Sequence, residues 1–198
     1  MSIEATPDPH VEQPATFTFS AENAAKIPGI IAKFPAGKQQ SATLPLLWLA
    51  QYQHGWLPTA AMDVVADMLN VPRIKVYETA SFYTMFNRKP IGKHHIQVCT
   101  TTPCWLRGSD GIVKACKEKL GIGFGQTTTD GQFAMSEVEC LGACCNAPMV
   151  QINDDVYEDL TPDSIISIID ALAAGKKPQT GSQQGRRGSE PKEVKVGA

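Results

Sequence analysis

Six cysteines stand in this chain of 198 residues, and four of them form two close pairs. Cys99 and Cys104 enclose four residues, and Cys140 and Cys144 enclose three. Thiolates bind soft and borderline metals, and closely spaced thiol pairs are common ligands of zinc ions and iron–sulfur clusters. The two pairs therefore predict a metal site that two separate segments of the chain assemble together.

The spacing within each pair discriminates between the two kinds of metal site. Zinc ribbons usually use cysteine pairs with two intervening residues, which turn both sulfurs onto one ion. The wider spacings in this sequence hold the sulfurs further apart and favour a [2Fe-2S] cluster, with each thiolate pair on one iron. The chain lacks the three closely spaced cysteines of plant-type ferredoxins. A structural zinc site is the alternative that spacing leaves open.

The remaining cysteines have other expected roles. Cys116 lies on the inward face of a predicted helix, so we expect it to pack in a core. Cys145 follows Cys144 directly and should point elsewhere, but spacing alone leaves it open as a substitute fourth ligand. Two disulfides are a weaker alternative. No lysine or arginine precedes Lys26, so neither a secretory nor a mitochondrial targeting signal is recognisable, and we expect a reducing compartment.

Alternating and β-branched residues predict the strands that position the cysteines. Residues 94–99 predict a strand that ends at Cys99, and residues 132–140 predict one that leads to Cys140. A helix should begin near Cys104 and reach residue 120. Two further strands and a final helix, capped by Thr161, follow the second cysteine pair. This order predicts an α/β fold with helices packed on a small sheet.

The N-terminal half has a different periodicity. Apolar residues recur at helical spacing in four segments, which predict a small helical bundle; these segments are residues 21–34, 38–54, 59–70 and 73–86. Composition and turn residues predict the domain limits. We expect a mobile arm at residues 1–18, the bundle at 19–90, the α/β domain at 91–175 and a disordered polar tail at 176–198.

Several functional classes are not supported by the sequence. A net charge of −2 gives no indication of a nucleic-acid surface, and no apolar run approaches the roughly 18 residues that a membrane span requires. No glycine-rich nucleotide fingerprint follows a strand, and His94 and His95 point to opposite strand faces. No nucleophile–base pair is recognisable, so no catalytic residue is predicted. We therefore expect a chain that can hold an electron but has no NADH or flavin site of its own.

Three motifs carry a resemblance to a known family. VCTTTPCWLRG, ECLGACCNAPMVQINDDVYEDLTP and ETASFYTMF resemble the 24-kDa subunit family of NADH:quinone oxidoreductase, the respiratory complex I. The resemblance extends over residues 19–175. It implies a thioredoxin-like [2Fe-2S] ferredoxin domain behind an N-terminal helical bundle. By position, the implied cluster ligands are Cys99, Cys104, Cys140 and Cys144. The thioredoxin-like fold also suggests a cis Ala147–Pro148 peptide bond.

The resemblance also implies a function and partners. The chain would be a non-autonomous electron-transfer subunit of this proton-pumping oxidoreductase, a translocase. Its [2Fe-2S] cluster would exchange single electrons with FMN on the NADH-binding subunit, and the iron–sulfur subunit of the peripheral arm would be a second partner. We expect a location peripheral to the inner face of the bacterial plasma membrane without insertion, or the matrix side for a trimmed mitochondrial protein.

Two rival functions remain open from the sequence. The same fold could serve as the diaphorase-type iron–sulfur subunit of a soluble NAD-linked hydrogenase or formate dehydrogenase. A non-redox interaction module with structural zinc is the second rival. The motifs do not separate the first rival from a respiratory complex, whereas the metal content would separate the second.

Overall fold

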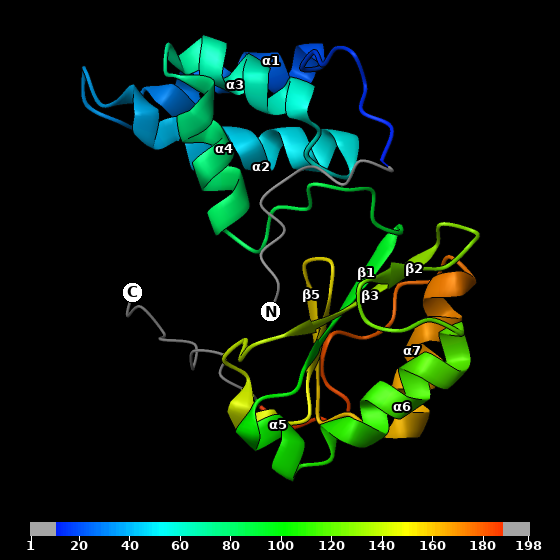
Figure 1. Cartoon of the computed structure of the whole chain (residues 1–198). Helices are drawn as coiled ribbons and strands as arrows, with labels where there is room; N and C mark the ends of the chain where they lie inside the picture. The colour runs from blue at the N-terminus through cyan, green and yellow to red at the C-terminus, as the bar shows by residue number, and fades with distance from the viewer. Residues whose placement is uncertain (1–10, 188–198) are drawn as a thin grey trace, which may run out of the picture. The chain divides into compact units, whose positions relative to one another are not determined.

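The computed structural model describes residues 11–187, and the chain divides into two compact units, Met1–Pro90 and Ile91–Ala198 (Figure 1). The first unit is helical, and the second combines a mixed sheet with helices. The predicted α/β class is therefore confirmed. None of the helices formed by residues 11–187 has the length and apolar character that a membrane crossing requires.

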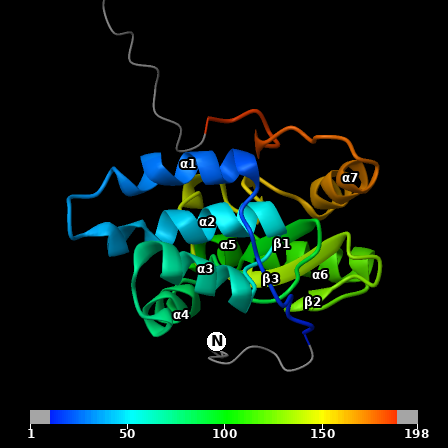
Figure 2. The same cartoon turned by 90° about the horizontal axis from the view of Figure 1, so that it is seen from above.

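Within residues 11–90, the first unit consists of four α-helices and one short 3-10 helix. They are α1 (Ala21–Ile31), η1 (Gln39–Ala42), α2 (Thr43–His54), α3 (Thr59–Leu69) and α4 (Arg73–Phe82). Ser20 caps α1, because its side chain accepts a hydrogen bond of 3.2 Å from the backbone N–H of Asn23. Gly55 ends α2 with a left-handed backbone, φ 88°. α1 runs alongside α2, as Figure 2 shows.

The apolar faces of these helices meet in one core. Its fully buried members include Leu46, Leu47, Leu57, Val65 and Val76. Residues of the predicted mobile arm also contact this unit. Gln13 accepts a hydrogen bond of 3.1 Å from the backbone of Thr59, and Phe17 packs against the helical core. The prediction of mobility is therefore not supported for these arm residues, and residues 1–10 lie outside the described part of the chain.

The second unit is organised by a six-stranded sheet in the order β2-β3-β1-β4-β5-β6. Its elements are β1 (His94–Cys99), α5 (Thr102–Leu106), α6 (Ser109–Leu120), β2 (Gln126–Thr127), β3 (Phe133–Val138), η2 (Cys144–Asn146), β4 (Val150–Ile152), β5 (Asp155–Glu158), α7 (Pro162–Ala173) and β6 (Gly181–Ser182). β1 pairs in parallel with β3 and antiparallel with β4. α6 and α7 lie side by side, and their buried residues share one core with the sheet (Figure 1).

Two features of this unit differ from the sequence prediction. The helix expected from Cys104 to residue 120 is broken into α5 and α6, because Gly108 adopts a left-handed backbone with φ 94°. The predicted disordered tail starts at Lys176, yet order continues to residue 187. β6 pairs in parallel with β5 there, and long-range side-chain contacts hold the segment. Residues 188–198 of the predicted tail lie outside the described residues.

Candidate metal centre

The first cysteine pair lies between the end of β1 and the first turn of α5. Cys99 is the last residue of the strand, as the alternation of residues 94–99 predicted. Cys104 lies within the short helix α5. Both side chains are buried, each 1% exposed. The hydroxyl oxygen of Thr101 lies 3.2 Å from Cys99 Sγ. Burial and a hydrogen bond with the Cys99 thiol raise the pKa of Cys104 to about 12.

The second cysteine pair lies in the loop between β3 and β4. The Sγ atoms of Cys140 and Cys144 are 3.1 Å apart, and the backbone N–H of Gly142 donates to Cys140 Sγ over 3.4 Å. Gly142 has φ 89°, a conformation that residues with a side chain rarely adopt. The hydrogen bond with Cys144 and the one from Gly142 lower the pKa of Cys140. The loop therefore holds two thiols close together with a backbone donor beside them.

The sheet brings the two cysteine pairs to the same place. β1 and β3 are parallel neighbours, and Cys99 stands opposite Val138 in the register. Both segments therefore leave the sheet at the same edge. The pKa of Cys144 is raised, chiefly by its hydrogen bond with the Cys140 thiol. Burial and the charges of Cys140 and Cys99 add to the shift. The parallel pairing of β1 and β3 thus brings the two predicted ligand pairs to the same edge of the sheet.

The donor set suits a binuclear cluster. All four thiols are free cysteines, and they form two pairs from separate segments. No three His, Cys, Asp or Glu side chains among residues 11–187 converge as the ligands of one metal ion would. Two pairs, each on its own iron, are what a [2Fe-2S] cluster requires. Protons on the thiols would be released when a metal binds, because only thiolates coordinate it.

The two pairs differ in their exposure to solvent. Cys99 and Cys104 form a small buried apolar cluster with three further side chains, those of Ala143, Ala147 and Met149. Cys140 is exposed and Cys144 is partly exposed. A bound group would therefore have one dry side and one side near the surface. A dry side limits water, which affects the redox potential of an iron–sulfur site.

The other sequence predictions for this unit have different outcomes. Cys116 is fully buried in the core between the helices and the sheet, as expected, and burial raises the pKa of its thiol to about 12. The Ala147–Pro148 peptide bond is cis, which confirms that prediction. Cys145 is exposed, and its exclusion from the ligand set remains a prediction. His95 contacts Ser136, with 2.8 Å between Nε2 and Oγ.

Sequence reasoning missed two residues that touch the cysteine segments. Thr101 contacts Cys99 through its hydroxyl, and the Arg186 guanidinium contacts the backbone of Cys145. Thr101 lies inside the first cysteine motif, but a threonine among three consecutive threonines carries no spacing signal. Arg186 lies in a polar segment whose composition resembles a disordered tail, so no local pattern indicates its contact.

Comparisons with known proteins identify sequences that are similar to this chain. Residues 27–173 match the sequence model of the family described as thioredoxin-like [2Fe-2S] ferredoxin. The chain is 60% identical over 157 residues to a NADH-quinone oxidoreductase subunit of Rickettsia bellii, covering 79% of this chain and 94% of that protein. It is 53% identical to the mitochondrial NADH dehydrogenase [ubiquinone] flavoprotein 2 of Dictyostelium discoideum, covering 88% of this chain and 71% of that one.

A solved structure has a related fold. The chain resembles an NAD+-reducing [NiFe]-hydrogenase in the H2-reduced state with a TM-score of 0.58 and 22% sequence identity. The match covers 65% of this chain but only 22% of the hydrogenase chain. At this level of identity the likeness concerns the fold alone.

Proposed function

Since the chain belongs to the 24-kDa subunit family of NADH-quinone oxidoreductase, which is built on a thioredoxin-like [2Fe-2S] ferredoxin, we propose that it is the electron-transfer subunit of such an enzyme. The observation that carries this proposal is the 60% identity to the Rickettsia bellii protein over 94% of that protein's length. The two thiol pairs at one edge of the sheet support it, because they provide the four ligands of the cluster.

The ligands in this proposal are Cys99 and Cys104 on the buried side and Cys140 and Cys144 on the exposed side. When bound, a [2Fe-2S] cluster accepts and releases one electron at a time. The protein contributes the thiolates, the Gly142 N–H that donates to Cys140, and an apolar wall that excludes water. Hydride chemistry belongs to a flavin on another subunit.

The partner that supplies electrons is the FMN- and NADH-binding subunit in this proposal. Three exposed apolar side chains adjoin the ligands in sequence: Trp105, Leu106 and Leu141 are 55%, 70% and 40% exposed. Exposed apolar groups beside a redox centre suit a protein partner that excludes water and brings its own cofactor near.

The second partner in this proposal is the iron–sulfur subunit of the peripheral arm. The proposed location is the inner face of the bacterial plasma membrane.

Reduction by NADH tests this function. We expect NADH to reduce the cluster of the purified chain only when the FMN-binding subunit is added, as followed by the EPR signal of the reduced cluster. Trp105→Ala combined with Leu141→Ala should weaken that transfer without altering the EPR signal obtained with dithionite. Ile74→Ala is the matched control, because Ile74 is 58% exposed in the helical unit. Unchanged transfer in the double variant would exclude this contact surface, and reduction by NADH without a partner would contradict the assigned role.

A further inference from the structure

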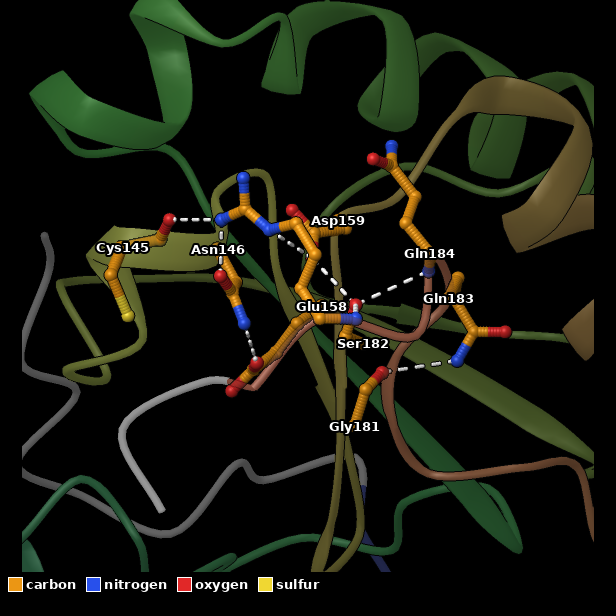
Figure 3. Close-up of polar contacts among 9 residues, drawn as sticks. Cys145, Asn146, Glu158, Asp159, Gly181, Ser182, Gln183 and Gln184 are labelled. Atoms are coloured by element: carbon orange, nitrogen blue, oxygen red, sulfur yellow. Dashed lines mark hydrogen bonds and ion pairs between the residues drawn. The ribbon is translucent and has the colours of Figure 1, made fainter. Parts of the chain in front are cut away.

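The segment that follows α7 returns to the cysteine loop. It forms β6, which pairs with β5 so that Ser182 stands opposite Glu158 (Figure 3). The backbone N–H of Arg186 donates to the Ser182 hydroxyl over 3.0 Å, which closes a turn after β6. The whole segment lies beyond residues 27–173, the part that matches the ferredoxin family. We refer to residues 181–186 as the C-terminal strap.

Arg186 connects the strap to the residues directly after the last proposed ligand. Its Nη2 donates to the carbonyl oxygen of Cys145 over 2.6 Å and also to the Asn146 side-chain oxygen. Cys145 and Asn146 follow Cys144 in the short helix η2. One guanidinium therefore holds two consecutive positions of the ligand loop, a geometry that its planar array of donors permits.

The same guanidinium pairs with a buried carboxylate. Arg186 Nε lies 3.3 Å from Oδ2 of Asp159, whose side chain is only 1% exposed. Ser182 of the strap donates to the same oxygen over 2.6 Å. A carboxylate buried to this degree requires both charge compensation and hydrogen bonds. The C-terminal strap provides the charge through Arg186 and a hydrogen bond through Ser182, so these contacts stabilise both buried Asp159 and the strap.

Asn146 links this ion pair to a second carboxylate. Asn146 is 1% exposed, and its Nδ2 donates to Glu158 Oε2 over 2.8 Å (Figure 3). The backbone N–H of Asp159 donates to the Asn146 carbonyl over 2.7 Å. A continuous polar network thus fixes the end of the ligand loop. Within this network, the Arg186 guanidinium connects the loop to Asp159.

We propose that Arg186 is a positioning residue for the cluster-binding loop: it anchors the loop after Cys144 and neutralises Asp159 beside it. This inference rests on the proposed function, because it assumes that the loop binds a cluster. Without the guanidinium, the Cys145 carbonyl loses its donor and Asp159 retains an uncompensated negative charge. Loss of the anchor should speed release of the cluster, and the uncompensated charge should lower its midpoint potential by disfavouring electron uptake.

The test compares Arg186→Ala with Arg187→Ala in the full chain. Both variants remove one positive charge from adjacent positions, but only the first removes the network contacts. We expect Arg186→Ala to lose its cluster roughly ten-fold faster than the wild type, as outer contacts of metal ligands typically contribute. Its midpoint potential, measured by EPR-monitored redox titration, should be lower, whereas Arg187→Ala should match the wild type in both measurements.

Two further variants separate charge from anchoring. Asp159→Asn combined with Arg186→Ala removes the buried charge, so it should restore the potential while cluster loss stays faster than in Asp159→Asn alone. It also provides a second test if Arg186→Ala fails to fold. Arg186→Lys keeps the positive charge, but a lysine cannot reach all three acceptors. Its midpoint potential should therefore lie near that of the wild type, while its cluster should still be lost faster.

The outcomes distinguish this inference from the proposed function. A wild-type chain that binds no iron and sulfide would overturn the function itself. A wild-type chain with a cluster, together with an Arg186→Ala variant that matches Arg187→Ala in potential and in rate of cluster loss, would overturn only the role of Arg186.

Discussion

The hydroxyl oxygen of Thr101 lies 3.2 Å from the sulfur of Cys99. Because a metal-bound thiolate carries no proton, the Thr101 hydroxyl would be the donor in this contact. Hydrogen bonds to the sulfurs are among the factors that set the potential of an iron–sulfur cluster. A donor stabilises the more negative, reduced form, so this contact should raise the potential.

Replacement of Thr101 tests that contact. Thr101→Val keeps the shape but removes the donor, and we expect the midpoint potential to fall. A differential stabilisation of about 1 kcal/mol corresponds to roughly 40 mV for a one-electron step. Thr101→Ser should retain the wild-type potential. Thr100→Val is the matched control, because the Thr100 hydroxyl donates to Glu137 over 2.7 Å and not to sulfur. A Thr101→Val potential equal to that of the wild type would contradict the assigned contact.

The ligand set is tested by single serine substitutions. We expect Cys140→Ser and Cys144→Ser to lower cluster retention by on the order of ten-fold or more, or to shift the EPR signal, because each removes a thiolate from an iron. Cys145→Ser and Cys116→Ser should keep the wild-type spectrum, since one thiol is exposed beside the site and the other is buried in the core. If Cys145→Ser loses the EPR signal and Cys144→Ser keeps it, then Cys145 rather than Cys144 is the fourth ligand.

Gly92 is a position where packing excludes a side chain. A Cβ added there would lie 2.5 Å from the carbonyl carbon of Phe133 and 2.8 Å from the backbone nitrogen of Ala134. Because the obstacle is backbone, β3 would have to move. We expect Gly92→Ala to lower the free energy of unfolding by about 1–3 kcal/mol in urea titrations.

Gly29→Ala is the control for that experiment. Gly29 lies inside α1, and nothing stands within 4 Å of an added Cβ. Alanine favours a helix over glycine by roughly 0.5–1 kcal/mol, so this variant should be neutral or slightly more stable. Equal stability of the Gly92→Ala variant and the wild type would show that β3 can move at no cost.

His95 should make stability depend on pH. Burial lowers the pKa of His95 to about 4, below the roughly 6.5 of an unfolded histidine. Between these values the unfolded chain binds a proton that the folded chain does not, so stability is retained above pH 6.5 and falls as the pH decreases toward 4. The loss from this residue is at most about 3 kcal/mol.

His95→Gln is the variant that tests this dependence. Glutamine does not titrate but can still bond the Ser136 hydroxyl, which lies 2.8 Å from His95 Nε2. In urea titrations from pH 7 to pH 4.5 we expect the variant to lose less stability than the wild type. Parallel stability curves for the two proteins would show that His95 does not contribute to acid sensitivity.

Much of the site could be predicted because its signals are local. The alternation of residues 94–99 predicts a strand ending at Cys99, and the structure has β1 at His94–Cys99. Spacing alone identifies the two cysteine pairs. Their meeting at one edge of the sheet requires the parallel pairing of β1 and β3, which the α/β order suggests. The helices of the first unit follow from their apolar periodicity.

The remaining features depend on contacts between residues that are distant in sequence. The polar composition of residues 176–187 predicts disorder. In the structure, Arg186 pairs with the buried side chain of Asp159, and composition carries no information on such a distant partner. The break between α5 and α6 depends on the left-handed conformation of Gly108 inside a pattern that otherwise continues as a helix. Thr101 escapes sequence reasoning for a similar reason, since its importance arises from where its hydroxyl points.

The measurement that tests the cluster assignment most directly is metal and sulfide analysis of the anaerobically purified chain, combined with EPR after dithionite reduction. We predict a red-brown protein with two irons and two acid-labile sulfides per chain and an EPR signal that appears on reduction. A colourless protein that holds one tightly bound zinc ion, with no iron and no EPR signal, would contradict the assignment of Cys99, Cys104, Cys140 and Cys144 as ligands of a [2Fe-2S] cluster.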